Sequence, residues 1–205
     1  MNQRKAVALL RFLYPFWALV GMFGLLYVPS QVTAQTISTH ELLFRTSIAT
    51  NLITQLFFII IPLLLYMLFE KVDKKLAILM VAFALVSVPI AMICKLTNIG
   101  ALLVKGSPDQ VKFFLDLHKQ GIVIAQIFWG LWLFPLGILV KNSGYFPKFI
   151  GWAVVIGGIG YTLDSFSTLI VPGLVALSPV FQFMTMGEIL FILWLIFKGV
   201  KLPKI

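Results

Sequence analysis

The sequence is poor in charge, in acidic residues and in cysteine. Only 11% of its 205 residues are charged, while 60% are hydrophobic. A soluble domain has roughly 25% charged residues, so this composition excludes an ordinary soluble surface and makes lipid the expected solvent. The one cysteine, Cys94, cannot form an internal disulfide, and the chain has no CxxC motif for redox or haem chemistry.

Recognisable catalytic, metal-binding and nucleotide-binding motifs are also missing. With only His40 and His118, a three-histidine zinc site within the chain is excluded, and no HExxH spacing occurs. There is no GxSxG motif and no P-loop. The glycines at positions 157, 158 and 160 lie inside an apolar segment, where they favour close helix packing. The cofactor is therefore unknown from the sequence.

Long apolar segments occupy most of the chain. A membrane-spanning helix needs about 20 apolar residues, and we predict six such helices in one transmembrane domain over residues 1–205. The segments are continuously apolar and too long for the strands of a membrane barrel. The predicted fold class is all-α, a polytopic membrane protein with a six-transmembrane-helix bundle. The spans cover approximately residues 9–28, 44–69, 76–104, 118–140, 149–171 and 179–198.

Basic residues predict the orientation of this bundle. Six spans place both termini on one side, which carries eleven Lys and Arg residues in the terminal segments and the second and fourth loops. The other side carries four: Arg45, Lys105, Lys112 and Lys119. The positive-inside rule therefore predicts that both termini are cytoplasmic, N-in and C-in. It also explains the net charge of +9 without a nucleic-acid partner. Membrane lipids are the expected partners, and a homodimer is an open alternative.

Three ionisable residues, Lys95, Asp164 and Glu188, lie inside predicted spans. A charge at the bilayer centre is costly, so such residues are kept where they are paired, hydrated or used. With a rise of about 1.5 Å per residue, all three fall roughly 10–14 Å below the non-cytoplasmic boundary. We therefore predict one outward-facing site in which Lys95 balances one acid. Its ligand-binding residues are Asn51, Gln55, Lys95, Asn98, His118, Gln126, Tyr161, Asp164 and Glu188.

Three functions are compatible with such a polar layer. The leading hypothesis is binding, or transport, of a small or amphiphilic ligand or a proton. The first alternative is an intramembrane enzyme with Asp164 or Glu188 as general acid or base and His118 as partner, which requires contacts of about 3 Å. The second is a structural or helper subunit whose polar residues only hold helices together. A metal site of His118, Asp164 and Glu188 is chemically conceivable, but no ligand spacing indicates it.

The second half of the chain contains a series of short motifs in a specific order. They are Leu115-Asp116-Leu117-His118, Phe128-Trp129-Gly130-Leu131, Pro135-Leu136-Gly137, Ser143-Gly144-Tyr145-Phe146-Pro147, Gly160-Tyr161, Asp164-Ser165 and Gly187-Glu188. This series resembles one uncharacterised bacterial membrane family, domain of unknown function 4386. The resemblance implies a multi-helix protein of the bacterial cytoplasmic (inner) membrane, and it implies no activity. It singles out His118, Tyr161, Asp164 and Glu188, which were chosen above on energetic cost.

Overall fold

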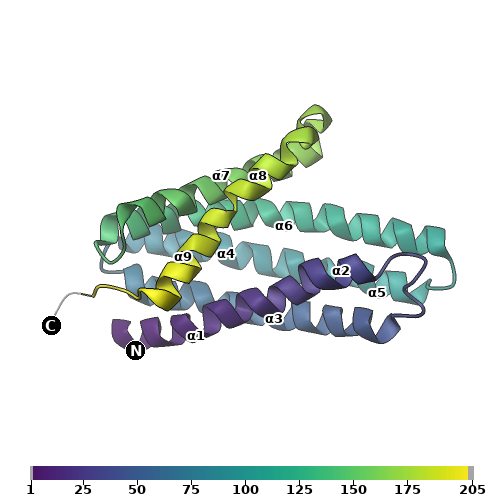
Figure 1. Cartoon of the computed structure of the whole chain (residues 1–205), viewed down its shortest axis with the longest axis horizontal. Helices are drawn as coiled ribbons and strands as arrows, with labels where there is room; N and C mark the ends of the chain where they lie inside the picture. The colour runs from purple at the N-terminus through teal and green to yellow at the C-terminus, as the bar shows by residue number, and fades with distance from the viewer. Residues whose placement is uncertain (1, 203–205) are drawn as a thin grey trace.

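The computed structural model describes residues 2–202, and helices account for nearly all of them (Figure 1). No strand occurs in this part of the chain, so the predicted all-α fold class is confirmed. The elements in order are α1 (Gln3–Met22), the π-helix η1 (Phe23–Tyr27), α2 (Val28–Gln31), α3 (Glu41–Phe69), α4 (Lys74–Ile93), α5 (Lys95–Leu103), α6 (Pro108–Ser143), α7 (Lys148–Ile170), the 3-10 helix η2 (Pro172–Leu177), α8 (Ser178–Met184) and α9 (Met186–Phe197).

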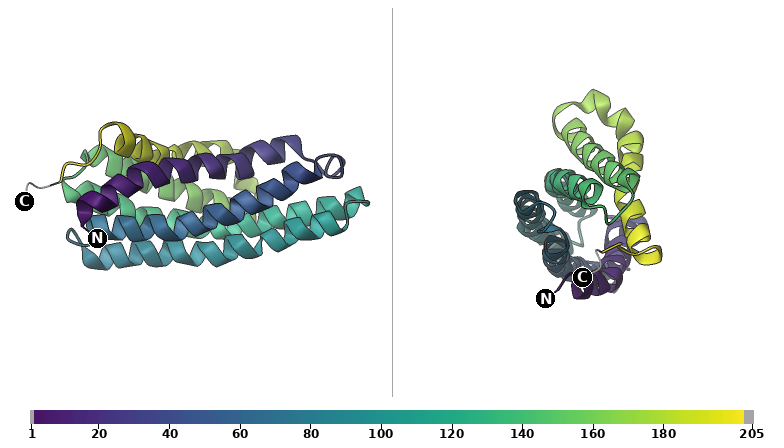
Figure 2. Two further views of the ribbon diagram at one scale, coloured as in Figure 1. Left: turned by 90° about the horizontal axis from the view of Figure 1, so that it is seen from below. Right: turned by 90° about the vertical axis from the view of Figure 1, so that its left-hand side faces the viewer.

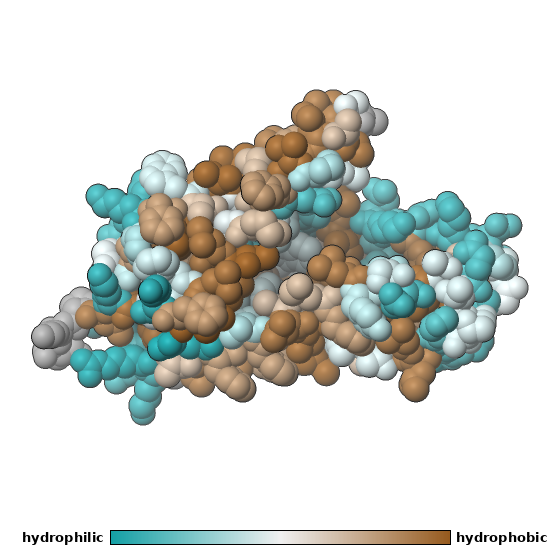
Figure 3. All heavy atoms as spheres, viewed as in Figure 1, coloured by the Kyte–Doolittle hydropathy of each residue, from teal (hydrophilic) through white to brown (hydrophobic). Residues whose placement is uncertain are grey.

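Six helical stretches are long and apolar enough to cross a membrane, which agrees with the six predicted spans. They are residues 3–31, 41–69, 74–103, 108–143, 148–170 and 173–197. Hydrophilic side chains gather at the two ends of the molecule, with a hydrophobic surface between them (Figure 3). The N-terminus and C-terminus lie at the same end (Figure 1). The protein is therefore a multi-pass membrane protein built as a helical bundle.

Local sequence signals explain where several helices begin and end. The side chain of Asn2 accepts a hydrogen bond from the Lys5 amide at the start of α1, and Asp73 caps α4 in the same way. Pro108 occupies the first turn of α6, where its missing amide hydrogen costs nothing. Gly144 ends α6 with a φ of 70°, a left-handed conformation that favours glycine.

Two hydrophobic cores hold the bundle together. The larger includes Tyr14, Phe69, Trp132 and Phe191, from α1, α3, α6 and α9. The smaller gathers side chains from α2, α3, α5 and α6 and from the segment between α2 and α3, among them Ile37. The smaller core contains no residue of α7 or α9, so these two helices pack against the larger core only.

Glycines bring α6, α7 and α9 into close contact, as the sequence predicted for the run at residues 157–160. A Cβ on Gly158 would lie 2.9 Å from the carbonyl oxygen of Gly130 on α6. A Cβ on Gly187 would lie only 1.8 Å from the carbonyl oxygen of Ala153 on α7. No larger residue fits at Gly187 unless one of the two helix backbones moves.

The hairpin formed by the C-terminal end of α7, η2 and α8 leans away from the other helices, whereas the rest of α7 packs along α6 (Figures 1 and 2). None of the residues of α8 is buried, and this helix packs mainly against α7, η2 and α9. Two spans are also interrupted, the third at Cys94 and the sixth at Thr185. The sequence did not predict these interruptions, because each lies inside a segment whose mean hydropathy is that of a single span.

Candidate functional site

A cavity of about 560 Å³ lies among α2, α3, α5, α6 and the segment after α2. These elements meet in the half of the bundle opposite the two termini (Figure 1). Three of the predicted ligand-binding residues line the cavity: Asn51 of α3, Asn98 of α5 and His118 of α6. The cavity reaches the molecular surface beside Lys112 and Lys119, whose side chains are 70% and 74% exposed.

The two asparagines form the buried part of the cavity wall. Asn51 is 3% exposed, and its amide nitrogen donates a hydrogen bond of 2.8 Å to the carbonyl oxygen of Ser47. Its side chain fits against the π-helix only because Gly24 lacks a Cβ, which would lie 2.5 Å from that nitrogen. Asn98 is 5% exposed, and its Oδ1 has no hydrogen-bond partner among the described residues. An unsatisfied buried acceptor is costly and favours a donor supplied by a ligand or water.

His118 joins this wall to the lysine of the third span. Its Nδ1 lies 2.9 Å from the carbonyl oxygen of Cys94, and its Nε2 lies 3.5 Å from Nζ of Lys95. Because the Cys94 carbonyl can only accept, its contact assigns the proton of the neutral ring to Nδ1 and leaves a lone pair on Nε2, to which the Lys95 amine donates. The Cys94 carbonyl also accepts from the Thr97 hydroxyl at 2.6 Å, where the third span is interrupted.

The expected ion pair between Lys95 and one of the buried acids is wrong. Lys95 is 3% exposed, yet no carboxylate lies within 4.0 Å of its amine in residues 2–202. The reason is that the helices carrying the lysine and the acids pack against different partners. The lysine is on α5, which packs mainly against α6, α4 and α3, whereas Asp164 and Glu188 are on α7 and α9, which pack against each other.

Asp164 instead joins three helical elements on the other side of α6. Gln126 of α6 donates from Nε2 to Asp164 Oδ2 at 2.9 Å, and the Ser178 hydroxyl of α8 donates to Oδ1. The Ser178 hydroxyl in turn accepts from Gln182 Nε2 at 3.1 Å. Both carboxylate oxygens of Asp164 therefore have partners, and the group ties the leaning hairpin to α6.

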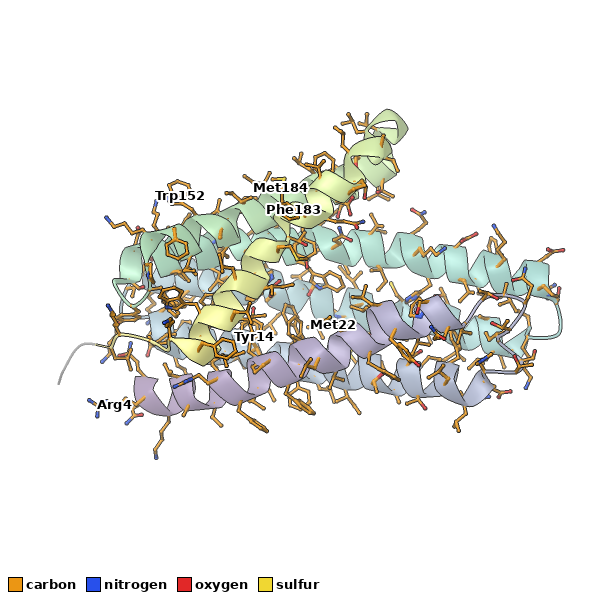
Figure 4. All side chains as sticks on the ribbon, viewed as in Figure 1. Arg4, Tyr14, Met22, Trp152, Phe183 and Met184 are labelled. Atoms are coloured by element: carbon orange, nitrogen blue, oxygen red, sulfur yellow. The ribbon has the colours of Figure 1, made fainter. Side chains whose placement is uncertain are left out.

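Glu188 forms a third, separate cluster. The hydroxyl of Tyr14 on α1 donates to Glu188 Oε1 at 2.7 Å, where α1 packs against α9 (Figure 4). Both side chains are buried, with Tyr14 completely enclosed. The neighbouring Trp17 packs its ring against Tyr14 at 5.5 Å between centroids, and its buried Nε1 has no partner among the described residues.

The remaining two predicted residues lie outside the cavity. Gln55 is 7% exposed on α3, and its Oε1 has no hydrogen-bond partner in the described chain. Tyr161 on α7 packs edge-on against Trp129 of α6, with 6.4 Å between ring centroids. The predicted single site is therefore divided into a cavity with Lys95 behind it and two hydrogen-bonded clusters.

This division bears on the catalytic and metal-binding alternatives. His118 contacts Cys94 and Lys95, while the two acids contact Gln126, Ser178 and Tyr14. No hydrogen bond joins His118 to either acid in residues 2–202. No group of three or more His, Cys, Asp or Glu side chains in this range could hold a metal ion, so the site of His118, Asp164 and Glu188 is not assembled.

Sequence reasoning missed the partners that define the two clusters. Tyr14 and Ser178 have no sequence signal that separates them from other tyrosines and serines of apolar segments. Their roles follow from which helices are adjacent and how each is rotated about its axis. The Cys94 carbonyl was also unpredictable, since a backbone acceptor becomes available to His118 only where the third span is interrupted.

The fold and these clusters define a multi-pass helical membrane protein with buried polar groups. The chain belongs to the family described as a domain of unknown function (DUF4386), whose model matches residues 12–199. It is also similar to an uncharacterized protein of Archaeoglobus fulgidus, with 39% identity over 82 residues. That match covers 40% of this chain and 48% of the relative, so it spans about half the length of the relative. No solved structure matches the chain.

Proposed function

We propose that the protein binds a small or amphiphilic ligand in the cavity lined by Asn51, Asn98 and His118. The observation that carries the proposal is a cavity of about 560 Å³ with a buried, unpartnered amide oxygen in its wall residue Asn98. This volume falls within the range of about 300–1,000 Å³ that is usual for small-molecule sites. A purely structural polar layer would be dry and fully paired.

Only part of the predicted residue set supports this proposal. Asn51, Asn98 and His118 line the cavity, and Lys95 supports it from behind through His118. Gln126 and Asp164, like Tyr14 and Glu188, bridge helices through hydrogen bonds. We assign these four residues the structural role that polar side chains commonly have between membrane helices.

We further propose that the protein lies in the cytoplasmic (inner) membrane of a bacterium with both termini in the cytoplasm. Support comes from the basic residues near the end that carries the termini, eleven against four in the sequence. In this orientation the cavity lies in the outer half of the membrane. Uptake of a ligand from the outer leaflet or the external medium is then the simplest route.

The test is to fill the cavity with a larger side chain and to determine by mass spectrometry whether a bound small molecule is lost. Leu115 lines the cavity, whereas Leu117 on the same helix is 46% exposed and lies outside it. We expect the native protein, purified from membranes, to carry a bound small molecule that mass spectrometry detects. Leu115→Trp should lose that molecule because the indole occupies its space, and Leu117→Trp should keep it. A native protein that carries only bulk lipid, or equal retention by both variants, would refute the proposal.

A further inference from the structure

We infer that the cavity takes an amphiphile with an anionic head group, whose charge balances Lys95. The inference rests on the proposed binding function and names the chemical class of the ligand. The shared chemistry is a carboxylate or phosphate on an apolar chain. Three features of the described residues support it: an unbalanced buried amine, a basic cavity mouth and apolar walls.

Lys95 is a buried amine without an acidic partner. It is 3% exposed, and the side chain within hydrogen-bonding distance of its Nζ is the neutral ring of His118, at 3.5 Å. No carboxylate lies within 4.0 Å of it in residues 2–202. When the amine carries its proton, this charge is uncompensated in a low-dielectric interior, which is strongly unfavourable. An anion bound in front of His118 supplies the missing counter-charge.

The mouth of the cavity has the same sign of charge. Its ionisable side chains other than His118 are Lys112, Lys119 and Asp116, all on α6. Asp116 lies 3.0 Å from the Lys112 amine and 3.3 Å from the Lys119 amine, so one acid is shared by two bases. One positive charge is left over at the entrance. Together with Lys95, it creates a field that attracts anions and repels cations.

The two buried acids of the predicted site add no negative charge to the cavity wall. Asp164 and Glu188 are absent from the cavity lining, and their carboxylates contact Gln126, Ser178 and Tyr14. Because neither acid faces the cavity, a bound anion meets no like charge there except that of Asp116. The arrangement therefore discriminates by charge as well as by size.

The rest of the lining is apolar and suits a hydrocarbon chain. Leu25, Val28 and Pro29 contribute one wall, and Leu115 and Ile122 of α6 contribute another. A head group near His118 can accept from the amide nitrogen of Asn98 through its anionic oxygens, while a bound water donates to Asn98 Oδ1. With its chain along the apolar walls, each part of the amphiphile then has a matching environment. A free inorganic anion would leave the apolar walls uncovered.

The experiment compares three probes with the same chain and different head groups. Dodecanoate, dodecyl phosphate and dodecanol are titrated against the purified full-length protein in a non-ionic detergent, and binding is followed by calorimetry. We expect both anions to bind at least tenfold more tightly than dodecanol. Preference for one anion identifies the head group as carboxylate or phosphate. Equal affinity for all three probes would overturn the inference and leave the binding function standing, whereas no binding by any probe would count against both.

Substitution of Lys95 provides the second test. Lys95→Met should weaken anion binding about tenfold and change dodecanol binding less than twofold, because it removes the charge and keeps an unbranched side chain only one atom shorter. Lys95→Arg should retain the anion preference. Lys105→Met is the matched control, since Lys105 is exposed at the same end and does not line the cavity. A preference for anions that survives Lys95→Met unchanged would refute the role of this amine.

The thermal stability of the ligand-free variant separates this role from a structural one. Removal of an unpaired buried charge should leave the melting temperature of Lys95→Met equal to or above that of the native protein. A structural lysine would instead give a clear decrease in melting temperature. Such a decrease, combined with an unaltered anion preference, would show that Lys95 serves only to hold α5 and α6 together.

Discussion

Individual residues in this protein are constrained most tightly where helix backbones meet. Gly187 is the extreme case, because the space for a Cβ is already occupied by the Ala153 carbonyl oxygen at 1.8 Å. Glycine is required there by proximity and not by backbone conformation, since its φ is not among the positive values. The same residue precedes Glu188, so its packing also sets the position of that carboxylate opposite Tyr14.

We predict that Gly187→Ala destabilises the protein by about 3 kcal/mol or more, the upper end of the usual effect of overpacking. The added methyl group forces α9 away from α7 and disturbs the larger core. Thermal unfolding in detergent, followed by circular dichroism, measures the change. Gly173→Ala is the control, because no atom lies within 4 Å of a Cβ at that position. Equal melting temperatures for the two variants would contradict this account of the α7–α9 contact.

At the scale of elements, hydrogen bonds decide how the leaning hairpin is attached. No residue of α8 is buried, so hydrophobic packing contributes little to its position. Gln126 and Ser178 meet at Asp164, which connects α6, α7 and α8 at one point. The sequence predicted Gln126 and Asp164 as members of a ligand site. Their mutual contact and the absence of both from the cavity lining indicate attachment of the hairpin instead.

We predict that Asp164→Leu destabilises the protein by about 1–3 kcal/mol, the sum of two interhelical hydrogen bonds in a membrane protein. Asp164→Asn should have a smaller effect, because its amide oxygen still accepts one of the two bonds. Amide hydrogen exchange should increase in α8 and η2 first. Ser167→Ala is the control on the same helix, since its hydroxyl contacts only the backbone oxygen of Asp164. Unchanged exchange in α8 after Asp164→Leu would show that other contacts hold the hairpin.

At the scale of the whole molecule, the two ends differ in charge and in structure. The end with both termini carries most of the basic residues, while the opposite half contains the smaller core and the cavity. The long helix α6 extends into that half, and the Glu41–Lys105 ion pair links α3 to the turn before α6. If the basic end faces the cytoplasm, the cavity is open to ligands of the outer leaflet.

We predict that Gly106 faces the outside of the cell and Asn142 faces the cytoplasm, because Gly106 lies just before α6 and Asn142 lies near its C-terminal end. Each is replaced by cysteine, as Gly106→Cys or Asn142→Cys, in a Cys94→Ser background. A membrane-impermeant maleimide added to intact cells should label only the Gly106→Cys protein, and lysis should expose the Asn142→Cys protein. The reverse pattern would invert the proposed topology and place the cavity in the cytoplasmic half.

The number and type of helices could be predicted from sequence because span length and apolar character are local properties. The run from Phe44 to Phe69 is long enough to cross a bilayer whatever its neighbours are, and the same holds for the other spans. The glycines near Gly158 were also interpretable, since small residues in a span favour close packing. The depth of Lys95, Asp164 and Glu188 in the membrane stays a prediction from the same reasoning.

The partners of those residues could not be predicted, because depth does not determine rotation about a helix axis. Lys95 was expected to meet either Asp164 or Glu188. Instead α6 supplies the partners, with His118 near Lys95 and Gln126 bonded to Asp164. Glu188 accepts a hydrogen bond from Tyr14 only because α9 crosses α1 at that point.

The sequence by itself therefore determined that the protein lies in lipid, that it has six spans, and which polar residues are costly to bury. Each of these follows from the length and hydrophobicity of one segment at a time. Tertiary packing alone decided that Asn51, Asn98 and His118 line a cavity and that Asp164 and Glu188 form two bridges between helices. It left Lys95 beside the cavity without an acid, because the contacts of a buried charge depend on which helices surround it.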